Sequence, residues 1–452
     1  MENTVQKLRE YYLAGNTRPY RYRIEKLRLL KKSIQRHRKD LLQALAQDLG
    51  KGETESELTE IGIVLSEISL FEKRLRRFMR PVRTGQSLAT MPSKNRIYPE
   101  PYGVCLLLAP WNYPFQLSLM PLVGAVAAGN VCVLRCSSQT KETAHIIRRI
   151  IRDCFTEEEC VALEDNDSYD EVLAPRYDFI FFTGSASTGK QIQKTAARHL
   201  TPIVLELGGK SPAIVDKTAH LPSAARRIVF GKMLNAGQTC IAPDYLLVEE
   251  EIREAFTEAL KKEFTRQVKD AVQNGDLPRI INDRQFDRLQ AYIDAHPSRW
   301  GGWYSKEHRL IQPALFYSVK RDDPVMQEEI FGPILPILSY TDFDTMLQAL
   351  QREEKPLSLY FFSRKKRRID QLLHTISFGG GCINDTMMHN AHPGLPFGGV
   401  GYSGMGAYHG KHSFDTFSHQ KAVLSSPVYL QIPIRYRPYA DWKKKWIRRI
   451  LR

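Results

Sequence analysis

Short apolar runs alternate with helical patterns from about residue 104 onward, and this alternation constrains the fold more than any other feature. Three runs of strand length lie at 104–109, 131–134 and 179–182. Patterns with the helical period cover 117–128 and 140–153 between them. Strands that are separated by helices form parallel βαβ units. The alternation therefore predicts a doubly wound parallel sheet.

A second series of apolar runs follows the first. It starts at 203–205 and includes 245–248, 335–338 and 359–362. The chain has 452 residues, which is too long for one ordinary hydrophobic core. We therefore expect an α/β protein with two doubly wound, Rossmann-like domains.

The first 100 residues precede this alternation. Residues 20–80 have helical periodicity, and residues 18–39 carry ten Lys or Arg side chains. Apolar residues from Ile24 to Leu45 recur there at near-helical spacing, which is typical of an amphipathic helix. The proline-rich segment 81–100 predicts an extended connector or an exposed hairpin.

Cysteine usage and hydropathy indicate the compartment. No apolar run reaches the roughly 20 residues that span a bilayer, and the N-terminus lacks the profile of a secretory signal. Seven cysteines occur at irregular spacings, so at least one is unpaired, and no Cys-x-x-Cys pair or Cys/His cluster indicates a metal. We expect a cytoplasmic protein with free thiols and no metal ion.

The formal net charge is +15, and basic residues concentrate at the two ends of the chain. The tail from Lys443 to Arg452 holds six basic residues and one Trp. One interpretation is weak contact with an anionic membrane surface or a nucleic acid. The other is a solvated, frayed terminus, which we favour because basic runs are commonly exposed faces.

A glycine-containing turn follows the run at 179–182. Gly184 and Gly189 let a ligand approach the backbone, and the helix that begins there offers N–H groups to a dinucleotide. The turn lacks the full G-x-G-x-x-G pattern. An ordinary strand-to-helix turn is therefore an equal alternative.

Two further segments carry reactive side chains. Glu206 stands at a strand end beside Gly208 and Gly209, and Cys240 lies in a loop of small and turn-forming residues, 235–243. A thiolate in such a loop can attack a carbonyl when its pKa is lowered or a base accepts its proton. By contrast, Cys105, Cys132 and Cys136 lie in or beside apolar strands, where a cysteine is a small buried residue.

These segments, in this order, resemble the aldehyde dehydrogenase superfamily, and within it the class 3 group. The resemblance covers about residues 5–440. Its matching motifs are Pro110–Pro114, Phe182–Gly189, Glu206–Pro212, Gly237–Tyr245, Glu328–Pro333, Leu395–Gly401 and Met405–Lys411.

The resemblance implies a mechanism of aldehyde oxidation to carboxylic acid. Cys240 attacks the aldehyde to give a thiohemiacetal, whose oxyanion the Asn112 amide and the Cys240 N–H hold. Hydride passes to the nicotinamide, and a thioester remains. Glu206 then activates the water that hydrolyses this thioester.

The family also implies a cofactor groove. Trp111, Gly184, Ser185 and Gly189 line it, Glu329 binds the nicotinamide ribose and Phe331 packs near the ring. The chain departs from the family where Lys-Pro-Ser-Glu is usual, because it has Arg135-Cys136-Ser137-Ser138. Arg135 and Ser138 favour a 2′-phosphate more than the usual Lys and Glu do. The cofactor is therefore NAD or NADP, with the preference open.

Other expectations follow from the same resemblance. Tyr113, Met233 and Leu234 border the substrate tunnel, which favours apolar aldehydes. Segments 81–100 and 412–435, with the strand at 413–419, form an oligomerisation element of a homodimer, and His409 and His412 are structural. The expected divisions are a dinucleotide-binding domain at 1–80 and 101–205, a catalytic domain at 206–411 and a basic tail at 436–452.

Three alternatives remain open. A CoA-acylating dehydrogenase passes the thioester to CoA, but that subgroup generally lacks the base at Glu206. A non-catalytic relative is expected to have lost Cys240, Asn112 or Glu206. A lipid- or nucleic-acid-binding protein needs basic and aromatic residues interleaved on one surface, whereas the charge here clusters at the termini.

Overall fold

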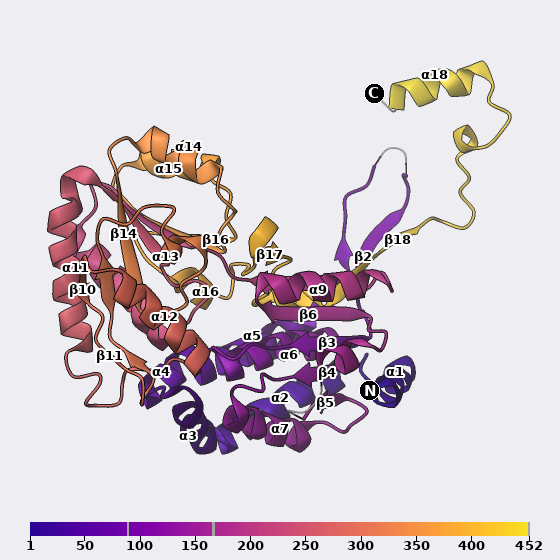
Figure 1. The fold of residues 1–452 in the computed structure, drawn as a ribbon. Helices are drawn as coiled ribbons and strands as arrows, with labels where there is room; N and C mark the ends of the chain where they lie inside the picture. The colour runs from indigo at the N-terminus through magenta and orange to yellow at the C-terminus, as the bar shows by residue number, and fades with distance from the viewer. Residues whose placement is uncertain (88–89, 165–167, 451–452) are drawn as a thin grey trace.

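The computed structural model describes residues 1–87, 90–164 and 168–450 and contains two large sheets with helices around them (Figure 1). The α/β class with parallel sheets is confirmed. Each sheet is buried because helices cover it, as parallel sheets require.

The first sheet has six strands in the order β17-β7-β6-β3-β4-β5, and only the β17 pairing is antiparallel. Its strands are β3 (Val104–Leu108), β4 (Val131–Arg135), β5 (Cys160–Ala162), β6 (Phe179–Gly184), β7 (Ile203–Leu207) and β17 (Gly404–Met405). One expectation is corrected here. The run at 203–205, assigned to the second series, is β7 and pairs in parallel with β6.

The second sheet has seven strands in the order β10-β13-β14-β9-β8-β15-β16. All of its pairings are parallel except β10 with β13. The strands are β8 (Pro212–Val215), β9 (Tyr245–Glu249), β10 (Arg299–Gly301), β13 (Ala314–Phe316), β14 (Ile334–Tyr340), β15 (Ser358–Phe362) and β16 (Gly380–Ile383). The strands β11 (Tyr304–Ser305) and β12 (Leu310–Ile311) pair separately.

Helices pack around both sheets. They are α1 (Glu2–Leu13), α2 (Tyr20–Arg36), α3 (Arg38–Leu49), α4 (Glu53–Ser56), α5 (Gly62–Phe78), α6 (Pro114–Ala128), α7 (Lys141–Cys154), α8 (Tyr169–Leu173), α9 (Ala186–Ala197), α10 (Leu221–Met233), α11 (Arg253–Val268), α12 (Asp283–Ala295), α13 (Pro324–Gln327), α14 (Phe343–Gln351), α15 (Lys366–Thr375), α16 (Met388–Ala391) and α17 (Lys411–Thr416). The predicted amphipathic helix with apolar residues from Ile24 to Leu45 is divided at His37 into α2 and α3, and the apolar stripe of both is buried.

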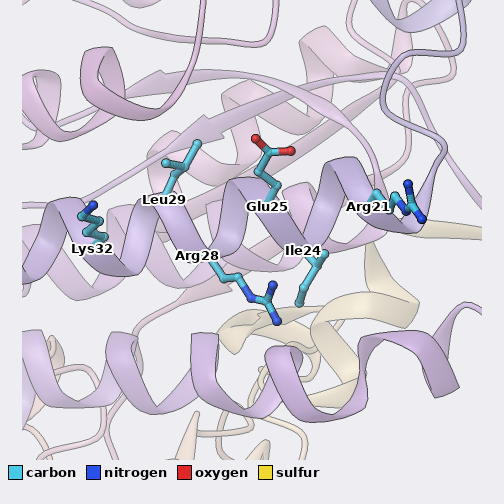
Figure 2. A pocket seen from close by; sticks show the side chains of 6 residues that line it. All are labelled: Arg21, Ile24, Glu25, Arg28, Leu29 and Lys32. Atoms are coloured by element: carbon cyan, nitrogen blue, oxygen red, sulfur yellow. The ribbon is translucent and has the colours of Figure 1, made fainter.

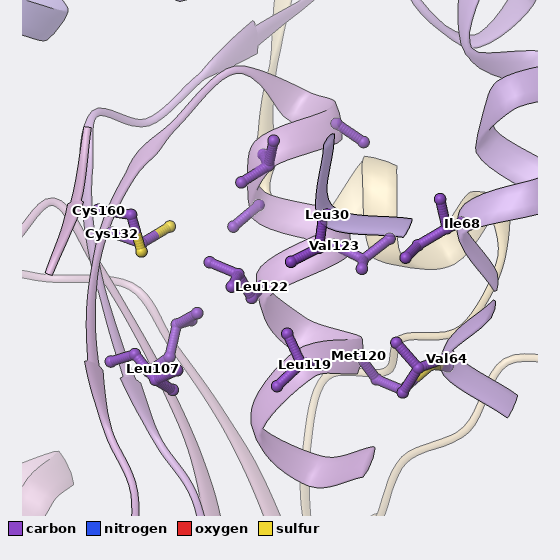
Figure 3. Close-up of a cluster of buried hydrophobic side chains, with 14 of the residues drawn as sticks. Leu30, Val64, Ile68, Leu107, Leu119, Met120, Leu122, Val123, Cys132 and Cys160 are labelled. Atoms are coloured by element: carbon purple, nitrogen blue, oxygen red, sulfur yellow. The ribbon is translucent and has the colours of Figure 1, made fainter. Parts of the chain in front are cut away.

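The core beside the first sheet explains why α6 is apolar on every side. All fifteen residues of α6 are buried, because the helix lies between the sheet and helices α2 and α5. Figure 3 shows Val123 of α6 beside Leu30 and Ile68, and Leu122 of α6 on the side toward Leu107 of β3. A fully buried helix of this kind fixes the loop that precedes it, which carries Trp111 and Asn112.

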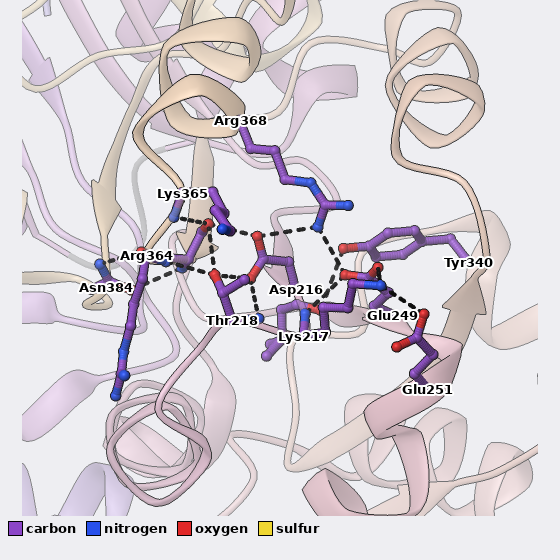
Figure 4. Close-up of polar contacts among 12 residues, drawn as sticks. Asp216, Lys217, Thr218, Glu249, Glu251, Tyr340, Arg364, Lys365, Arg368 and Asn384 are labelled. Carbon is purple, nitrogen blue, oxygen red and sulfur yellow. Dashed lines mark hydrogen bonds and ion pairs between the residues drawn. The ribbon is translucent and has the colours of Figure 1, made fainter.

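A charged cluster joins the carboxyl ends of three strands of the second sheet. Asp216 follows β8 and Glu249 ends β9, and both are buried. Arg368 of α15 bridges them at 3.3 and 2.9 Å, and Ser363 after β15 donates to Asp216 at 2.6 Å (Figure 4). Because the two carboxylates are paired by side chains of the chain itself, the cluster stabilises this edge of the sheet.

A small antiparallel sheet forms from the two predicted oligomerisation segments. It contains β1 (Val82–Arg83), β2 (Lys94–Pro101) and β18 (Ser418–Ser425), in the order β1-β2-β18. Segment 413–419 is not one strand, because residues 413–416 belong to α17 and the strand begins at Ser418. Residues 88–89 of the expected hairpin lie outside the described residues.

The basic tail is helical rather than frayed. Residues Asp441–Ile450 form α18, at the end of an extended segment that leads away from the two large sheets (Figure 1). Trp442 and Trp446 are about half exposed on it. The last two residues of the tail, 451 and 452, lie outside the described part. Among the helices of the described residues, none combines the length and hydrophobicity that crossing a bilayer requires.

Candidate active site

Cys240 lies on the wall of a cavity of about 390 Å³, within the usual size of small-molecule sites. It follows a short 3₁₀ turn, Leu234–Gly237, and precedes β9. Helices α5, α6 and α10 and the segment 387–409 supply the other walls. The apolar lining residues include Leu117, Met120, Phe230, Leu234, Ile241, Met387 and Phe397, and the polar ones include Glu67, Gln116, Thr239, Asn390, Tyr408 and His409.

The backbone before the thiol has an unusual shape. Asn235, Ala236 and Gly237 have φ values of +53°, +52° and +74°, a left-handed run that only Gly adopts without strain. A Cβ on Gly237 would lie 2.4 Å from the Gly332 carbonyl oxygen. The Gln238 side chain donates to the Asn235 carbonyl at 3.1 Å and accepts from the Ile281 N–H at 3.0 Å. These contacts fix the position of the next residues, Thr239 and Cys240.

Asn112 is tied directly to this turn. Its side-chain amide donates to the Gln238 carbonyl at 3.1 Å, and its own carbonyl accepts from the Asn235 side chain at 2.7 Å. Asn112 is 3% exposed. An amide NH₂ has two hydrogens, so one of them is not used by the bond to Gln238.

A buried ion pair supports the loop that carries Asn112. Lys51 and Glu60 are fully buried and lie 2.6 Å apart. The other oxygen of Glu60 accepts from the N–H groups of Phe115 and Gln116 at 3.2 and 2.8 Å, at the start of α6. Lys51 also lies 4.2 Å from the centroid of the Tyr113 ring. A carboxylate at a helix N-terminus is favourable, so the pair fixes where α6 begins.

Glu206 is the carboxylate nearest to the thiol. It lies in β7, is 1% exposed and has no hydrogen-bond partner of good geometry among the described residues for either carboxylate oxygen. Burial raises the pKa of Glu206 to about 7, although the Cys240 thiol and the Thr183 hydroxyl beside it lower the pKa. A carboxyl group with this pKa exchanges protons readily near neutral pH.

The same burial acts on the thiol. It raises the pKa of Cys240 well above its usual range, and the negative charges of Glu206 and Glu329 raise it further. The thiol must therefore lose its proton before it can attack a carbonyl, and the nearby carboxylates oppose this loss while they are ionised.

The candidate cofactor residues gather at one edge of the six-stranded sheet. Trp111 follows β3, Arg135 ends β4 and Gly184 ends β6. From β3 the chain order proceeds through β4 in one direction and through β6 in the other, so β3 and β6 flank a switch point of the topology. Ligands of doubly wound sheets bind in the crevice at such a point, outside the carboxyl ends of the strands.

The comparisons with known proteins cover the whole chain. The model of the "Aldehyde dehydrogenase family" matches residues 2–423. A 4,4'-diaponeurosporen-aldehyde dehydrogenase of Staphylococcus aureus is 41% identical over 99% of this chain and 98% of its own length. Human aldehyde dehydrogenase family 3 member B1 is 43% identical over 96% of this chain and 94% of its own.

A solved structure agrees with these relatives. The substrate-bound state of Staphylococcus aureus AldH has a TM-score of 0.96 and 40% identity, and the alignment covers 100% of this chain and 99% of that one. The chain belongs to the aldehyde dehydrogenase family. The resemblance in the sequence is thereby confirmed, and the chain is an oxidoreductase that acts on aldehydes with NAD or NADP. Neither the CoA-acylating nor the non-catalytic alternative is favoured.

On the cofactor side of this aldehyde dehydrogenase, Ser185 caps α9. Its hydroxyl accepts from the Thr188 N–H at 3.3 Å. Gly189 allows α9 to approach β7, because a Cβ there would lie 2.8 Å from a methyl carbon of Leu207. Arg135 lies with its guanidinium 4.1 Å from the centroid of the Tyr169 ring, and Ser138 is exposed.

Glu329 and Phe331 lie on a loop that a second ion pair holds. Lys210 lies 2.5 Å from Asp244 and donates to the Glu328 carbonyl at 2.7 Å. Asp244 also accepts from the Ile330 N–H at 2.9 Å. Burial, with the charges of Asp244 and Glu206, raises the pKa of Glu329 well above its usual range. The Phe331 ring packs edge-on against Trp111 with 5.3 Å between centroids.

Two of the three expected substrate residues line the cavity. Tyr113 and Leu234 line the cavity, and the Tyr113 hydroxyl lies 2.6 Å from that of Thr239. Met233 is not among the described residues that line it, and it packs instead with the core around α10. Sequence reasoning missed Tyr408, which the Met405–Lys411 motif contains, and it assigned no cavity role to His409.

A second depression lies on the surface of α2, far from Cys240 in the sequence and formed by one helix. Arg21, Arg28 and Lys32 surround Ile24 and Leu29 there (Figure 2). It contains neither a nucleophile nor a buried polar group, so it is not the site of the aldehyde chemistry.

The contact at Gly237 generates a prediction. Gly237→Ala adds a Cβ against the Gly332 carbonyl, so the unfolding free energy should fall by about 2–3 kcal/mol and the turnover rate should fall with it. Urea denaturation and steady-state kinetics measure the two effects. Gly275→Ala is the matched control, because its φ is +71° but nothing lies within 4 Å of the added Cβ. An equal loss of stability in both variants would show that backbone strain alone matters.

Proposed function

We propose that Cys240 is the nucleophile, that Asn112 stabilises the oxyanion and that Glu206 is the general base of this aldehyde dehydrogenase. One observation carries the proposal. A carboxyl group with a pKa near 7 lies beside a thiol on a cavity wall, and an amide with an uncommitted hydrogen is held against the same turn.

The first steps involve the thiol and the amide. The Cys240 thiol loses its proton to solvent, and its sulfur attacks the carbonyl carbon of the aldehyde. The oxygen of the resulting thiohemiacetal becomes negative and accepts hydrogen bonds from the Asn112 side chain and the Cys240 N–H. One such donor lowers the barrier by about 3–4 kcal/mol.

The cofactor residues fit a nicotinamide dinucleotide. The N-terminus of α9 with Ser185 suits its phosphates, as do Arg135 and Ser138, and the Glu329 carboxylate suits ribose hydroxyls. When bound, the nicotinamide accepts the hydride of the thiohemiacetal carbon. Trp111 and Phe331 border the place for its ring, and Gly184 and Gly189 belong to the end of β6 and the first turn of α9.

The substrate is an aldehyde with an apolar body. This proposal rests on the lining of the cavity by Leu117, Met120, Phe230 and Leu234, which bury hydrocarbon favourably. Glu67 lines the same space, so an anionic substrate is disfavoured by its charge when it is ionised.

We also propose that residues 1–80 and 101–205 form a dinucleotide-binding domain and 206–411 a catalytic domain. The protein works as a cytoplasmic homodimer. Seven cysteines that form no disulfide among the described residues fit a reducing compartment. The strand β18 exposes most of its residues, including Val423 and Leu424, which suits a subunit contact. Sedimentation velocity tests the dimer, because it distinguishes 51.9 kDa from twice that mass.

The catalytic assignment predicts the kinetics of two variants. Cys240→Ala should abolish oxidation while cofactor binding persists. Glu206→Gln should give a burst of reduced cofactor followed by little turnover, because acylation precedes the need for a water-activating base. In the parent, kcat should rise tenfold per pH unit below about pH 7 and level off above it, because Glu206 acts when ionised. Parent-like turnover in either variant would contradict the assignment.

Cofactor preference generates a second prediction. We propose that the enzyme accepts NADP beside NAD, because Ser138 carries no negative charge to repel a 2′-phosphate and Arg135 is nearby. A charged hydrogen bond contributes roughly 1.5–3 kcal/mol, so Ser138→Glu should raise the NAD over NADP ratio of kcat/KM at least tenfold. Gln139→Glu, one residue further along, is the control. An unchanged ratio in Ser138→Glu would show that this loop does not set the preference.

We also propose that the tail contacts an anionic membrane surface. The support for this contact is the basic helix α18 with Trp442 and Trp446 exposed. Deleting residues 446–452 should leave turnover intact and reduce sedimentation of the protein with phosphatidylserine vesicles. Equal sedimentation with and without these residues would show that the tail is only solvated.

A further inference from the structure

Tyr408 is buried in the cavity wall and has no established task. It is 1% exposed, lines the cavity with Cys240, and its hydroxyl has no hydrogen-bond partner within the described residues. A buried hydroxyl without a partner costs roughly 1–3 kcal/mol of stability. A hydroxyl that lowers stability in this way is expected to have a functional partner near it.

Strands β6 and β7 and the segment after β17 bring the side chains of Thr183, Glu206 and Tyr408 into one region. β17 pairs antiparallel with β7 in the register Gly404↔Glu206, so the segment that leads from it to Tyr408 runs beside β7. The Tyr408 ring packs edge-on against Phe181 of β6, with 5.0 Å between the centroids. Thr183 lies two residues further along β6, and it pairs with Glu206 of β7.

The side-chain oxygens of these three residues share one property, which is the lack of a hydrogen-bond partner among the described residues. Both Glu206 carboxylate oxygens, the Thr183 hydroxyl and the Tyr408 hydroxyl are buried without a partner of good geometry in the part of the chain that is described. Burial, followed by the charges of Glu206 and Cys240, raises the pKa of Tyr408 well above its usual range. The phenol is therefore neutral during catalysis, and its ring packs on β6 two residues before Thr183, the strand partner of Glu206.

Such a cluster is what a single buried water molecule requires, because ordered waters in proteins take two to four polar partners. We propose that Tyr408 is a positioning residue that holds the hydrolytic water between its hydroxyl and the Glu206 carboxylate. This inference rests on the proposed roles of Cys240 and Glu206, and it concerns only the second half of the reaction.

Water, Glu206 and Cys240 are the groups that exchange bonds and protons in the hydrolysis of the thioester. The water donates one hydrogen to Glu206 and the other to the Tyr408 hydroxyl oxygen, which leaves its lone pairs free for the acyl carbon. The water oxygen bonds to that carbon, and Glu206 takes the proton. The carbon–sulfur bond then breaks, and the thiolate of Cys240 takes the proton from Glu206. The products are the carboxylic acid and the free thiol.

Tyr408→Phe tests the inference by pre-steady-state kinetics of the full-length enzyme with an alkanal and NAD. We expect the burst of reduced cofactor to persist and the steady-state rate to fall roughly five- to tenfold, since one hydrogen bond is lost. Hydroxylamine, which attacks the acyl-enzyme without a positioned water, should return the variant to the parent rate. The inflection of the pH profile should stay near 7, because Glu206 is unchanged.

Tyr177→Phe is the matched control. Tyr177 is buried at 2% exposure, and its hydroxyl donates to the Val172 carbonyl at 2.8 Å in another part of the fold. This change should lower stability and leave the ratio of burst to steady-state rate as in the parent. If Tyr408→Phe also keeps the parent ratio, or if burst and steady-state rates fall together without hydroxylamine rescue, Tyr408 has no role in deacylation.

A second measurement does not depend on the variant. A high-resolution crystal structure of the parent should contain an ordered water about 3 Å from both the Glu206 carboxylate and the Tyr408 hydroxyl. Its absence from well-defined density would overturn the inference even if Tyr408→Phe did not fold. Failure of the proposed function would give a different result from failure of this inference, because the parent would then show no Cys240-dependent burst of reduced cofactor.

Discussion

The chemistry of this site depends on one carboxyl group that the fold buries without a hydrogen-bond or ion-pair partner among the described residues. Elsewhere in this protein buried carboxylates have cations or N–H groups against them, as Glu60 has Lys51 and Asp216 has Arg368. Glu206 has a thiol and a hydroxyl as neighbours, and no hydrogen bond of good geometry among the described residues. The result is a pKa of about 7, which makes Glu206 a base that is half ionised near neutral pH.

This arrangement costs stability, and the surrounding structure offsets it. Glu206 lies in β7, a strand buried between β6 and β17, so its side chain cannot turn away to solvent. The loops that meet it are fixed by paired charges: Lys51 with Glu60 at the start of α6, and Lys210 with Asp244 beneath Glu329. The two ion pairs thus hold the loops around the site, and the carboxyl group of Glu206 remains available for proton transfer.

The sequence predicted local elements well, because their patterns are local. Apolar runs between turn formers indicated β3, β4, β6, β9 and β15, and the stripe from Ile24 to Ile34 indicated α2. The sheet to which β7 belongs was predicted wrongly, since pairing with β6 and β17 depends on contacts distant in sequence. The helical state of α18 was also not expected, because its basic composition alone suits a solvated chain equally.

Some candidate site residues were found from the residues around them, and others only from the resemblance to a family. Composition singled out Cys240 as a cysteine among turn formers, but only resemblance to a family pointed to Asn112 and Glu329. No periodicity placed Tyr408 or His409 on the cavity wall, because their positions depend on the bridge between Phe397 and Tyr408. Met233 adjoins Leu234 in sequence, yet it faces the core beside α10, since neighbouring residues at a helix end point in different directions.

The central claim is that an acyl group forms on Cys240 and that Glu206 is needed to remove it. Intact-protein mass spectrometry of Glu206→Gln after mixing with NAD and an alkanal tests this claim most directly, with peptide mapping to locate the adduct. We expect a mass increase equal to one acyl group, on the peptide that contains Cys240, and no increase in the Cys240→Ala, Glu206→Gln double variant. An adduct on another residue, or none while reduced cofactor accumulates, would contradict it.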